Sequence, residues 1–186
     1  MPYIEVIEHE NAEGELLEAY NELIRTRGKL ASIHKIHSLN PKAMMDHMDL
    51  YMTLLYGNSP LKRLHREMLG TVVSIANKCE YCQLHHAEAM NHYWKDDARI
   101  KLFLDDYHSA GLNELELELC KYAYNHTVSP ETDKKEGLER MKELGLSDRA
   151  ILDATMIIAY FNFVNRIVMG LGVATEAEGV GGYKFD

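Results

Sequence analysis

Cysteine is scarce in this sequence, with only three in 186 residues. Three cysteines are too few for the disulfide framework that holds small secreted domains together. We therefore expect a soluble protein of a reducing compartment, the cytoplasm. In that setting a close cysteine pair is more often redox-active or metal-binding than a structural disulfide.

Basic residues are outnumbered as well, with 20 Lys and Arg against 29 Asp and Glu and a formal net charge of −9. A nucleic-acid surface needs a basic stripe, so we expect no nucleic-acid partner. The first residues lack the basic region and the apolar region that make up a secretory signal peptide. No apolar run approaches the roughly 18 residues needed to cross a bilayer, so we expect no membrane partner.

Strand patterns are missing too, since no segment alternates apolar and polar residues between hairpin turns. Apolar residues instead recur at helical spacing. We predict an all-α helical bundle, with a helix hairpin carrying a C-x-x-C motif. The 46% of hydrophobic residues suffices for a single domain over residues 1–186. The expected helices cover about residues 11–28, 30–38, 41–57, 59–76, 79–93, 96–106, 113–123, 129–145 and 147–169. We expect the glycine-rich residues 176–186 to form a mobile tail or an arm on a neighbouring subunit.

The chemistry concentrates in residues 79–86, which read CEYCQLHH. On a helix, Cys79, Cys82 and His86 fall on one face, and the two cysteine α-carbons lie roughly 5 Å apart, within reach of a disulfide. The start of a helix favours an anion, and His86 can take the thiol proton, so both features promote a thiolate. If the chain folds back at Asn77, Glu67 lies opposite residue 87 and can orient His86. These residues predict a dithiol redox centre.

Glu67 is followed by eleven residues, then Cys79-x-x-Cys82, three more residues and His86. This spacing resembles the signature of the alkyl hydroperoxidase D (AhpD)-like branch of the carboxymuconolactone decarboxylase family. Residues 72–74 (VVS), 77 (N) and 88–89 (EA) are similar too, and residues 159–166 (AYFNFVNR) resemble the closing helix of its peroxidase-related subgroup. The motif match covers about residues 60–92, and a looser likeness spans most of the chain.

The resemblance implies an all-helical homo-oligomer, a trimer or hexamer, that runs a peroxidase cycle without a cofactor. Cys82 would attack a hydroperoxide and become a sulfenic acid, and Cys79 would condense with it to a disulfide. His86 and Glu67 would relay protons. A dithiol reductant, such as a lipoyl domain or a thioredoxin-like protein, would reopen the disulfide.

This chain departs from the family pattern at Tyr81, where the founding hydroperoxidase has a histidine. A phenol is a poor base near neutral pH, so we expect a less efficient relay, with His85 as a partial substitute that points about 100° away from His86. Family members that decarboxylate a lactone lack the C-x-x-C, so the family name does not describe the expected reaction.

Other interpretations stay open from the residues alone. Cys79, Cys82 and His86, with Glu67 or His85, could bind zinc. The protein could also be a redox-sensing or adaptor oligomer with little turnover. Several residues also have an ordinary structural explanation. Cys79 and Cys82 could be small core residues, Glu67 a solvated carboxylate, and Cys120 an inert core thiol. The Met44–Met52 stripe could be core or subunit contact, and His34, His37, His47, His65 and His92 could be surface or satisfied polar groups.

Overall fold

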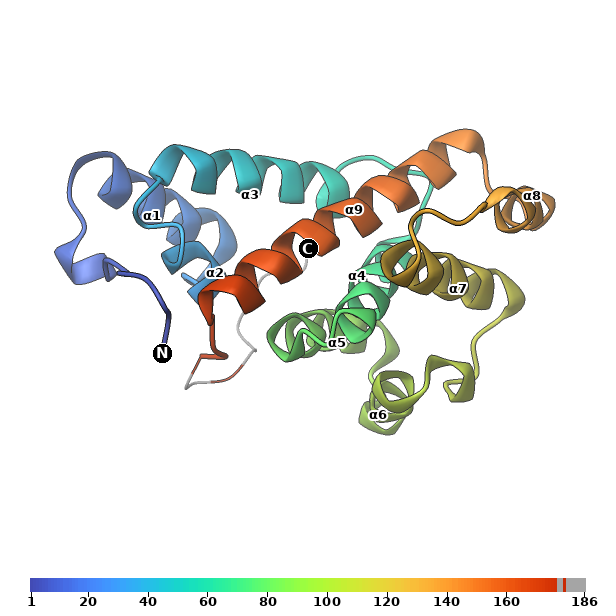
Figure 1. Ribbon diagram of the computed structural model, residues 1–186. Coiled ribbons are helices and arrows are strands. Elements are labelled where there is room, and N and C mark those ends of the chain that lie inside the picture. Colours follow the sequence, from blue (N-terminus) through green and yellow to red (C-terminus); the bar gives the residue numbers. More distant parts are fainter. Residues whose placement is uncertain (177–178, 180–186) are drawn as a thin grey trace.

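A computed structural model of the chain describes residues 1–176 and residue 179. These residues form nine α-helices and no strand, which confirms the all-α prediction. The helices are α1 (Gly14–Arg27), α2 (Ser32–Lys35), α3 (Pro41–Tyr56), α4 (Arg63–Ala76), α5 (Glu80–Trp94), α6 (Asp97–Asp105), α7 (Glu114–Val128), α8 (Lys135–Glu143) and α9 (Asp148–Leu171), with short 3-10 helices at His9–Asn11 and Tyr107–Ser109 (Figure 1).

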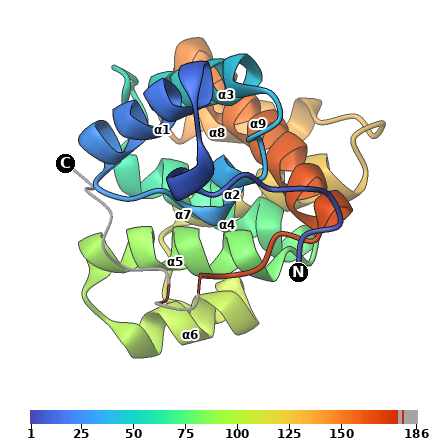
Figure 2. The ribbon, with the colours of Figure 1, turned by 90° about the vertical axis from the view of Figure 1, so that its left-hand side faces the viewer.

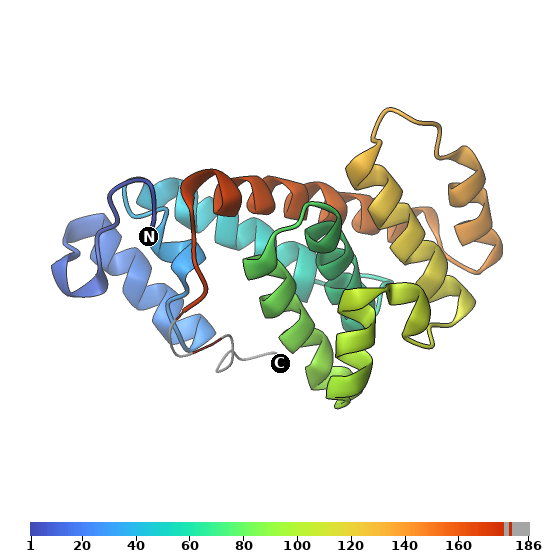
Figure 3. The same cartoon turned by 60° about the horizontal axis from the view of Figure 1, so that its bottom comes forward.

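Helix α4 lies at the centre of the bundle and packs against α5, α7 and α9. Every residue from His65 to Ser74 is buried, as expected for a helix covered on all sides. The chain then turns through Asn77 and Lys78, and the Cys79 N–H donates to the Ser74 carbonyl at 2.9 Å. This turn makes α4 and α5 the expected helix hairpin (Figure 3).

The longest helix, α9, lies along α3 and also packs against α4 and α7 (Figures 1 and 3). It contributes to a large apolar core that includes Leu69, Val73, Ile157 and Phe161. A smaller apolar cluster joins α1 to α3, and Tyr51 packs against both. The first turn of α5 belongs to the larger cluster through Cys79, Tyr81 and Cys82.

Side-chain caps mark the starts of four of the nine α-helices. Asn40, Asp96, Asn113 and Ser147 each accept a hydrogen bond from a backbone N–H in the first turn of the following helix. Gly28 ends α1 with φ 85°, a left-handed conformation that favours glycine.

Two Ser-Pro helix starts are wrong, because other contacts outweigh the local signal. Ser59 donates to Asp153 of α9 at 2.6 Å, and α4 begins only at Arg63. Likewise Ser129 ends α7, and the Lys134 ammonium donates to the Ser129 carbonyl at 2.7 Å, so α8 begins at Lys135.

The prediction that no apolar run approaches a bilayer-spanning length is wrong for helix α9. By length and composition alone it could cross a membrane. It packs against α3, α4 and α7, however, and a core helix has the same length and composition.

After α9 the chain folds back toward α2 (Figure 2). The Ser32 N–H donates to the Glu176 carboxylate at 2.7 Å, and Lys29 donates to the Gly179 carbonyl at 3.1 Å. Glu176 therefore contacts its own chain. The rest of the tail for which we expected a mobile segment or an arm, residues 177–178 and 180–186, lies outside the described residues.

Candidate active site

The C-x-x-C pair begins α5, as the sequence predicts. Cys79 is the N-cap of the helix, and Cys82 lies in its first turn. Both are free thiols and both are buried, and their sulfurs are 3.1 Å apart, at hydrogen-bonding distance. Little movement would bring these sulfurs to bonding distance.

Glu67 and His86 meet across the hairpin. The His86 Nδ1 and the Glu67 Oε2 are 2.6 Å apart, and Glu67 has an exposed fraction of 0%. A carboxylate only accepts, so Nδ1 carries the proton and Nε2 is the nitrogen left for proton exchange. The predicted pairing is confirmed to within one residue, and the solvated-carboxylate interpretation of Glu67 is wrong.

Arg63 holds the other oxygen of the carboxylate. Its guanidinium donates to Glu67 Oε1 through Nε at 3.0 Å and also through Nη2. Burial alone would raise the pKa of Glu67, but the charges and hydrogen bonds of His86 and Arg63 lower it below its ordinary value. Glu67 is therefore ionised at neutral pH and fixes the orientation of the imidazole.

The hydrogen bond between the two thiols shifts their pKa values in opposite directions. The hydrogen bond with Cys82 lowers the pKa of Cys79, helped by the Cys82 N–H and opposed by burial. The same hydrogen bond and burial raise the pKa of Cys82. The first proton lost belongs to the pair, with the negative charge favoured at Cys79. A proton shift across 3.1 Å would move that charge to Cys82.

Asn165 of α9 is a site residue that we did not identify from the sequence. It is fully buried, its Oδ1 accepts from Asn77 at 3.0 Å, and its Nδ2 donates to Ser74 at 3.2 Å. The same amide hydrogen-bonds Cys82, which lowers the pKa of that thiol against the larger effects of Cys79 and burial. Two signals were available: Asn165 lies in residues 159–166, which resemble the closing helix of the family subgroup, and it occupies a core position of an apolar helix, where a buried amide needs partners.

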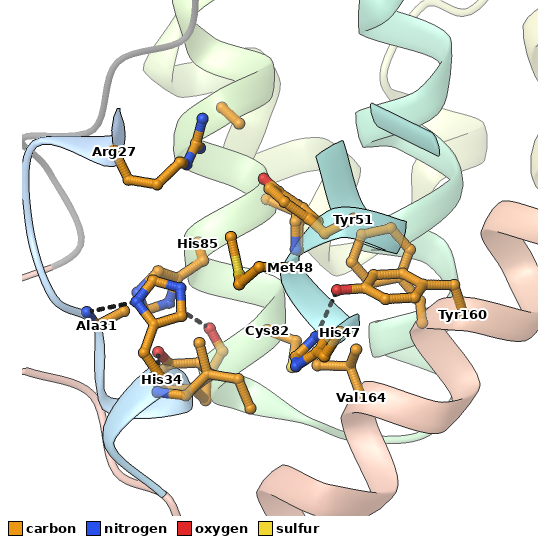
Figure 4. Close-up of a pocket in the computed structure, with 15 residues that line it drawn as sticks. Arg27, Ala31, His34, His47, Met48, Tyr51, Cys82, His85, Tyr160 and Val164 are labelled. Carbon is orange, nitrogen blue, oxygen red and sulfur yellow. Dashed lines mark hydrogen bonds between the residues drawn. The ribbon is translucent and has the colours of Figure 1, made fainter. Parts of the chain in front are cut away.

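A cavity of about 90 Å³ opens beside the pair. Of the two cysteines only Cys82 lines it, together with His86 (Figure 4). Among the described residues, no hydrogen bond joins His86 to either sulfur, so the expected proton transfer from the thiol needs a water or a substrate between them. The full lining is Arg27, Ala31, Ile33, His34, His47, Met48, Tyr51, Tyr81, Cys82, His85, His86, Ala89, Tyr160, Phe161 and Val164.

Tyr81, at the position of the family histidine, contacts the chain end. Its hydroxyl accepts from the Ile33 N–H at 3.2 Å and donates to Glu176 at 3.1 Å. The His85 Nδ1 faces the Tyr81 carbonyl at 2.9 Å, and its Nε2 faces Glu176 at 3.1 Å. Both facing groups are acceptors, so His85 is oriented toward Glu176 and toward its own helix.

Glu176 therefore forms a second carboxylate–histidine pair beside Glu67–His86. Burial would raise the pKa of Glu176, but hydrogen bonds from His85 and the Ser32 N–H lower it well below its ordinary value. His85 thus pairs with Glu176 as His86 pairs with Glu67, and its role as a partial substitute for the family histidine stays a prediction.

His34, His47 and His65 are buried and have polar partners, which fits the satisfied polar groups expected rather than surface residues. His34 and His47 line the cavity, where burial lowers their pKa values to about 3 and about 4. The His47 Nε2 lies 2.6 Å from the Tyr160 hydroxyl, so a neutral dyad forms the wall shared by α3 and α9 (Figure 4).

The proposed zinc ligands do not come together. Among residues 1–176 and 179, no group of three His, Cys, Asp or Glu side chains could hold a metal ion. Glu67 is bound by Arg63 and His86, and His85 is bound to Glu176. Cys120 is fully buried, and burial raises its pKa, as expected for an inert core thiol.

Comparison with known proteins agrees with this fold. Residues 41–123 match the model of the carboxymuconolactone decarboxylase family, and no curated protein matches the chain. An uncharacterised peroxidase-related protein from Silicibacter sp. TM1040 is 25% identical over 92% of this chain and 89% of its own, with a TM-score of 0.83.

Two further solved structures share the fold. An uncharacterised peroxidase-related protein from Ralstonia eutropha JMP134, described as an alkylhydroperoxidase AhpD core, is 19% identical over 96% of this chain and 94% of its own, with a TM-score of 0.86. A variant of the debrominase Bmp8 bound to 2,3,4-tribromopyrrole is 18% identical over 94% of this chain and 92% of its own, with a TM-score of 0.78.

Proposed function

We propose that this chain, which matches the carboxymuconolactone decarboxylase family over residues 41–123 and has the fold of AhpD-like proteins, is an AhpD-like thiol peroxidase. It would reduce hydroperoxides through a Cys79–Cys82 disulfide cycle. One observation carries the proposal. The two sulfurs lie 3.1 Å apart at the start of α5, and Cys82 opens onto a cavity that it shares with His86.

The reaction balances with the two thiols as the only reductant. The Cys82 thiolate attacks the terminal oxygen of the hydroperoxide, the O–O bond breaks, and the departing alkoxide takes a proton to leave as the alcohol. Cys79 then attacks the sulfur of the Cys82 sulfenic acid, and hydroxide leaves as water. One hydroperoxide and two thiols give one alcohol, one water and one disulfide.

His86 and Glu67 support this cycle by proton transfer. With Nδ1 held by Glu67, the His86 Nε2 is available to exchange a proton with Cys82 or the alkoxide through a water or the bound substrate. Removal of the pair by Glu67→Gln or His86→Ala should slow the reaction of the thiols with peroxide by about 100-fold.

A cytoplasmic dithiol protein, such as a lipoyl domain or a thioredoxin-like protein, would return the pair to its reduced form. Its thiolate attacks one sulfur of the disulfide, and its second thiol resolves the mixed disulfide. The dependence of turnover on such a reductant separates an enzyme from a redox sensor that reacts once.

The proposal is tested by treating the reduced protein with one equivalent of an alkyl hydroperoxide. Mass spectrometry of alkylated peptides should show a Cys79–Cys82 disulfide in the wild type and in Cys120→Ser. Cys79→Ser should hold a sulfenic acid at Cys82, and Cys82→Ser should consume no peroxide. Two free thiols after this treatment would contradict the proposal.

Reductive debromination is a second candidate, because the cavity has the flat walls that suit an aromatic ring, from Tyr51, Tyr160 and Phe161. The debrominase Bmp8 shares the fold. The same dithiol would convert an aryl bromide and two thiols into the arene, hydrogen bromide and a disulfide. Bromide release from 2,3,4-tribromopyrrole, measured beside peroxide consumption, decides between the two substrates.

A further inference from the structure

Arg27, the last residue of α1, is a buried cation at the end of the cavity away from the thiols. Its exposed fraction is 5%, and it lines the same cavity as Cys82. Figure 4 shows Arg27 at the upper left and Cys82 below it near the centre of the view, with Met48 between them. A molecule that fills this space would touch both ends.

The guanidinium of Arg27 makes few polar contacts. Its Nη2 donates to the Tyr56 hydroxyl at 2.9 Å, and its central carbon lies 4.6 Å from the ring centre of Tyr56 and 5.5 Å from that of Tyr51. Within the described part of the chain, no carboxylate pairs with it.

A second buried arginine shows how this fold satisfies a guanidinium for structural purposes. Arg66 donates to the carbonyls of Leu54, Leu55, Gly57 and Leu61 and so spends its N–H groups on backbone. Arg27 has no comparable set of acceptors among residues 1–176 and 179. Most of its donors are left for a ligand.

The charges around Tyr51 and Tyr56 do not cancel. Arg63 stacks on Tyr56 at 3.6 Å from the ring centre and is paired with Glu67, which leaves the charge of Arg27 without a counterion among the described residues. A buried charge is costly unless it is paired, so a cation that faces a ligand cavity favours an anion there.

We propose that Arg27 is an anion-binding subsite, and that the molecule reduced at Cys82 is a small organic substrate carrying a carboxylate. The guanidinium suits a carboxylate, which it can bind through two parallel hydrogen bonds. Met48, Tyr51 and Phe161 line the space between and would contact an apolar body. The identification of this substrate as a carboxylated hydroperoxide rests on the proposed function.

The kinetic test compares cumene hydroperoxide with its para-carboxylate. We expect the wild type to prefer the carboxylate by about 10-fold or more in kcat/KM, through KM. Arg27→Gln should reduce the preference to within about twofold by raising KM for the carboxylate more than KM for the neutral substrate, and Arg27→Lys should keep part of the preference. The matched control is Arg25→Gln, because Arg25 is exposed on the same helix and paired with Glu22.

A binding test works without peroxidase activity. Excess 4-phenylbutyrate should slow the alkylation of Cys82 by iodoacetamide about 10-fold more than 4-phenylbutyramide does, and Arg27→Gln should abolish the difference. This result would hold even if the protein reduced no hydroperoxide, so it separates the subsite from the proposed function.

Two results would overturn the subsite. One is a carboxylate preference that is unchanged in Arg27→Gln, or the absence of any carboxylate preference in the wild type in both tests. The other is a change in the alkylation rate of Arg27→Gln without any ligand, because the charge would then act on the thiolate rather than on a bound anion.

Discussion

At the scale of single residues, the two thiols form a coupled pair rather than two independent groups. The hydrogen bond between them lowers the pKa of Cys79 and raises that of Cys82. The sulfur with the lower pKa is therefore not the one that lines the cavity. Attack by Cys82 requires its proton to move to Cys79, or away through the cavity, as substrate binds.

This coupling predicts how single-cysteine variants titrate. In Cys82→Ala, Cys79 loses the hydrogen bond that stabilises its thiolate, so its pKa should rise above the first step of the wild type. In Cys79→Ala, Cys82 loses the bond that raises its pKa, so it should titrate below the second wild-type step. Alkylation rates against pH, resolved by mass spectrometry in a Cys120→Ala background, measure both shifts.

Thiol titrations that stay at the wild-type values in both variants would show that the sulfurs do not interact. The Asn165→Leu variant offers an internal check, because loss of its hydrogen bond should raise the pKa of Cys82 while leaving that of Cys79 nearer its wild-type value.

The buried histidines of the cavity predict a loss of stability in mild acid. Above about pH 6.5 His34 and His47 are neutral in both folded and unfolded chains. As the pH falls toward the folded pKa values of about 3 and about 4, only the unfolded chain takes up protons. At pH 5 each histidine should lower the free energy of unfolding by about 2 kcal/mol.

Urea denaturation at pH 7 and pH 5 tests this loss. His47→Gln should lose about 2 kcal/mol less than the wild type between the two pH values, because glutamine does not titrate. Lys42, which is exposed on the same helix, provides Lys42→Gln as a control that should keep the wild-type loss. An equal loss in all three proteins would mean that His47 protonates equally in the folded state.

Residue-level inference succeeded where a motif fixes both partners. The C-x-x-C register, with a turn at Asn77, sufficed to place Glu67 against His86. It failed for Asn165, His47 and Glu176, because α9, α3 and the segment after α9 approach the site through tertiary packing. No local pattern encodes these approaches.

At the scale of helices, the site depends on a close crossing of α4 and α9. Gly70 lies where a Cβ atom would meet Phe161 Cε2 at 2.6 Å. The same ring packs edge-on against His86, with 4.4 Å between ring centres. A glycine here lets Phe161 support the imidazole from behind.

Gly70→Ala should therefore damage both packing and chemistry. Overpacking costs about 1–3 kcal/mol, which the better helix propensity of alanine offsets only in part, and displacement of Phe161 should slow peroxide reduction. Chemical denaturation and peroxide kinetics measure the two effects. Gly137→Ala in α8, where a Cβ would meet nothing within 4 Å, should be stabilising by about 0.5–1 kcal/mol with unchanged kinetics.

Helix starts show why local signals predict elements unevenly. Asn113 and Ser147 cap the helices that follow them, and within residues 1–176 and 179 their side-chain oxygens have no other hydrogen-bond partner. Ser59 has the same local appearance, but its hydroxyl donates to Asp153, which joins the loop to α9. A cap is predictable from sequence only while its oxygen has no tertiary partner.

At the scale of the whole molecule, α9 is apolar on two sides. One side forms the core, while the other presents an outward stripe at helical spacing. Leu152 is 54% exposed and Phe163 50%, and Met156, on the same face, is also exposed. This second stripe accounts for the membrane-like composition of α9. An exposed apolar stripe of this length is typical of a surface that another subunit covers.

We expect a second copy of this chain to cover the stripe, in line with the trimer or hexamer that the family resemblance implies. Phe163→Glu should convert the oligomer to a monomer, because a charge would be buried without a partner at the subunit contact. Size-exclusion chromatography with light scattering measures the mass. Leu102→Glu, at an exposed leucine of α6, should leave the oligomer intact. A monomeric wild type at micromolar concentration would show that the α9 stripe is not a self-association surface. If Phe163→Glu and Leu102→Glu dissociate the oligomer to the same extent, the subunit contact lies elsewhere.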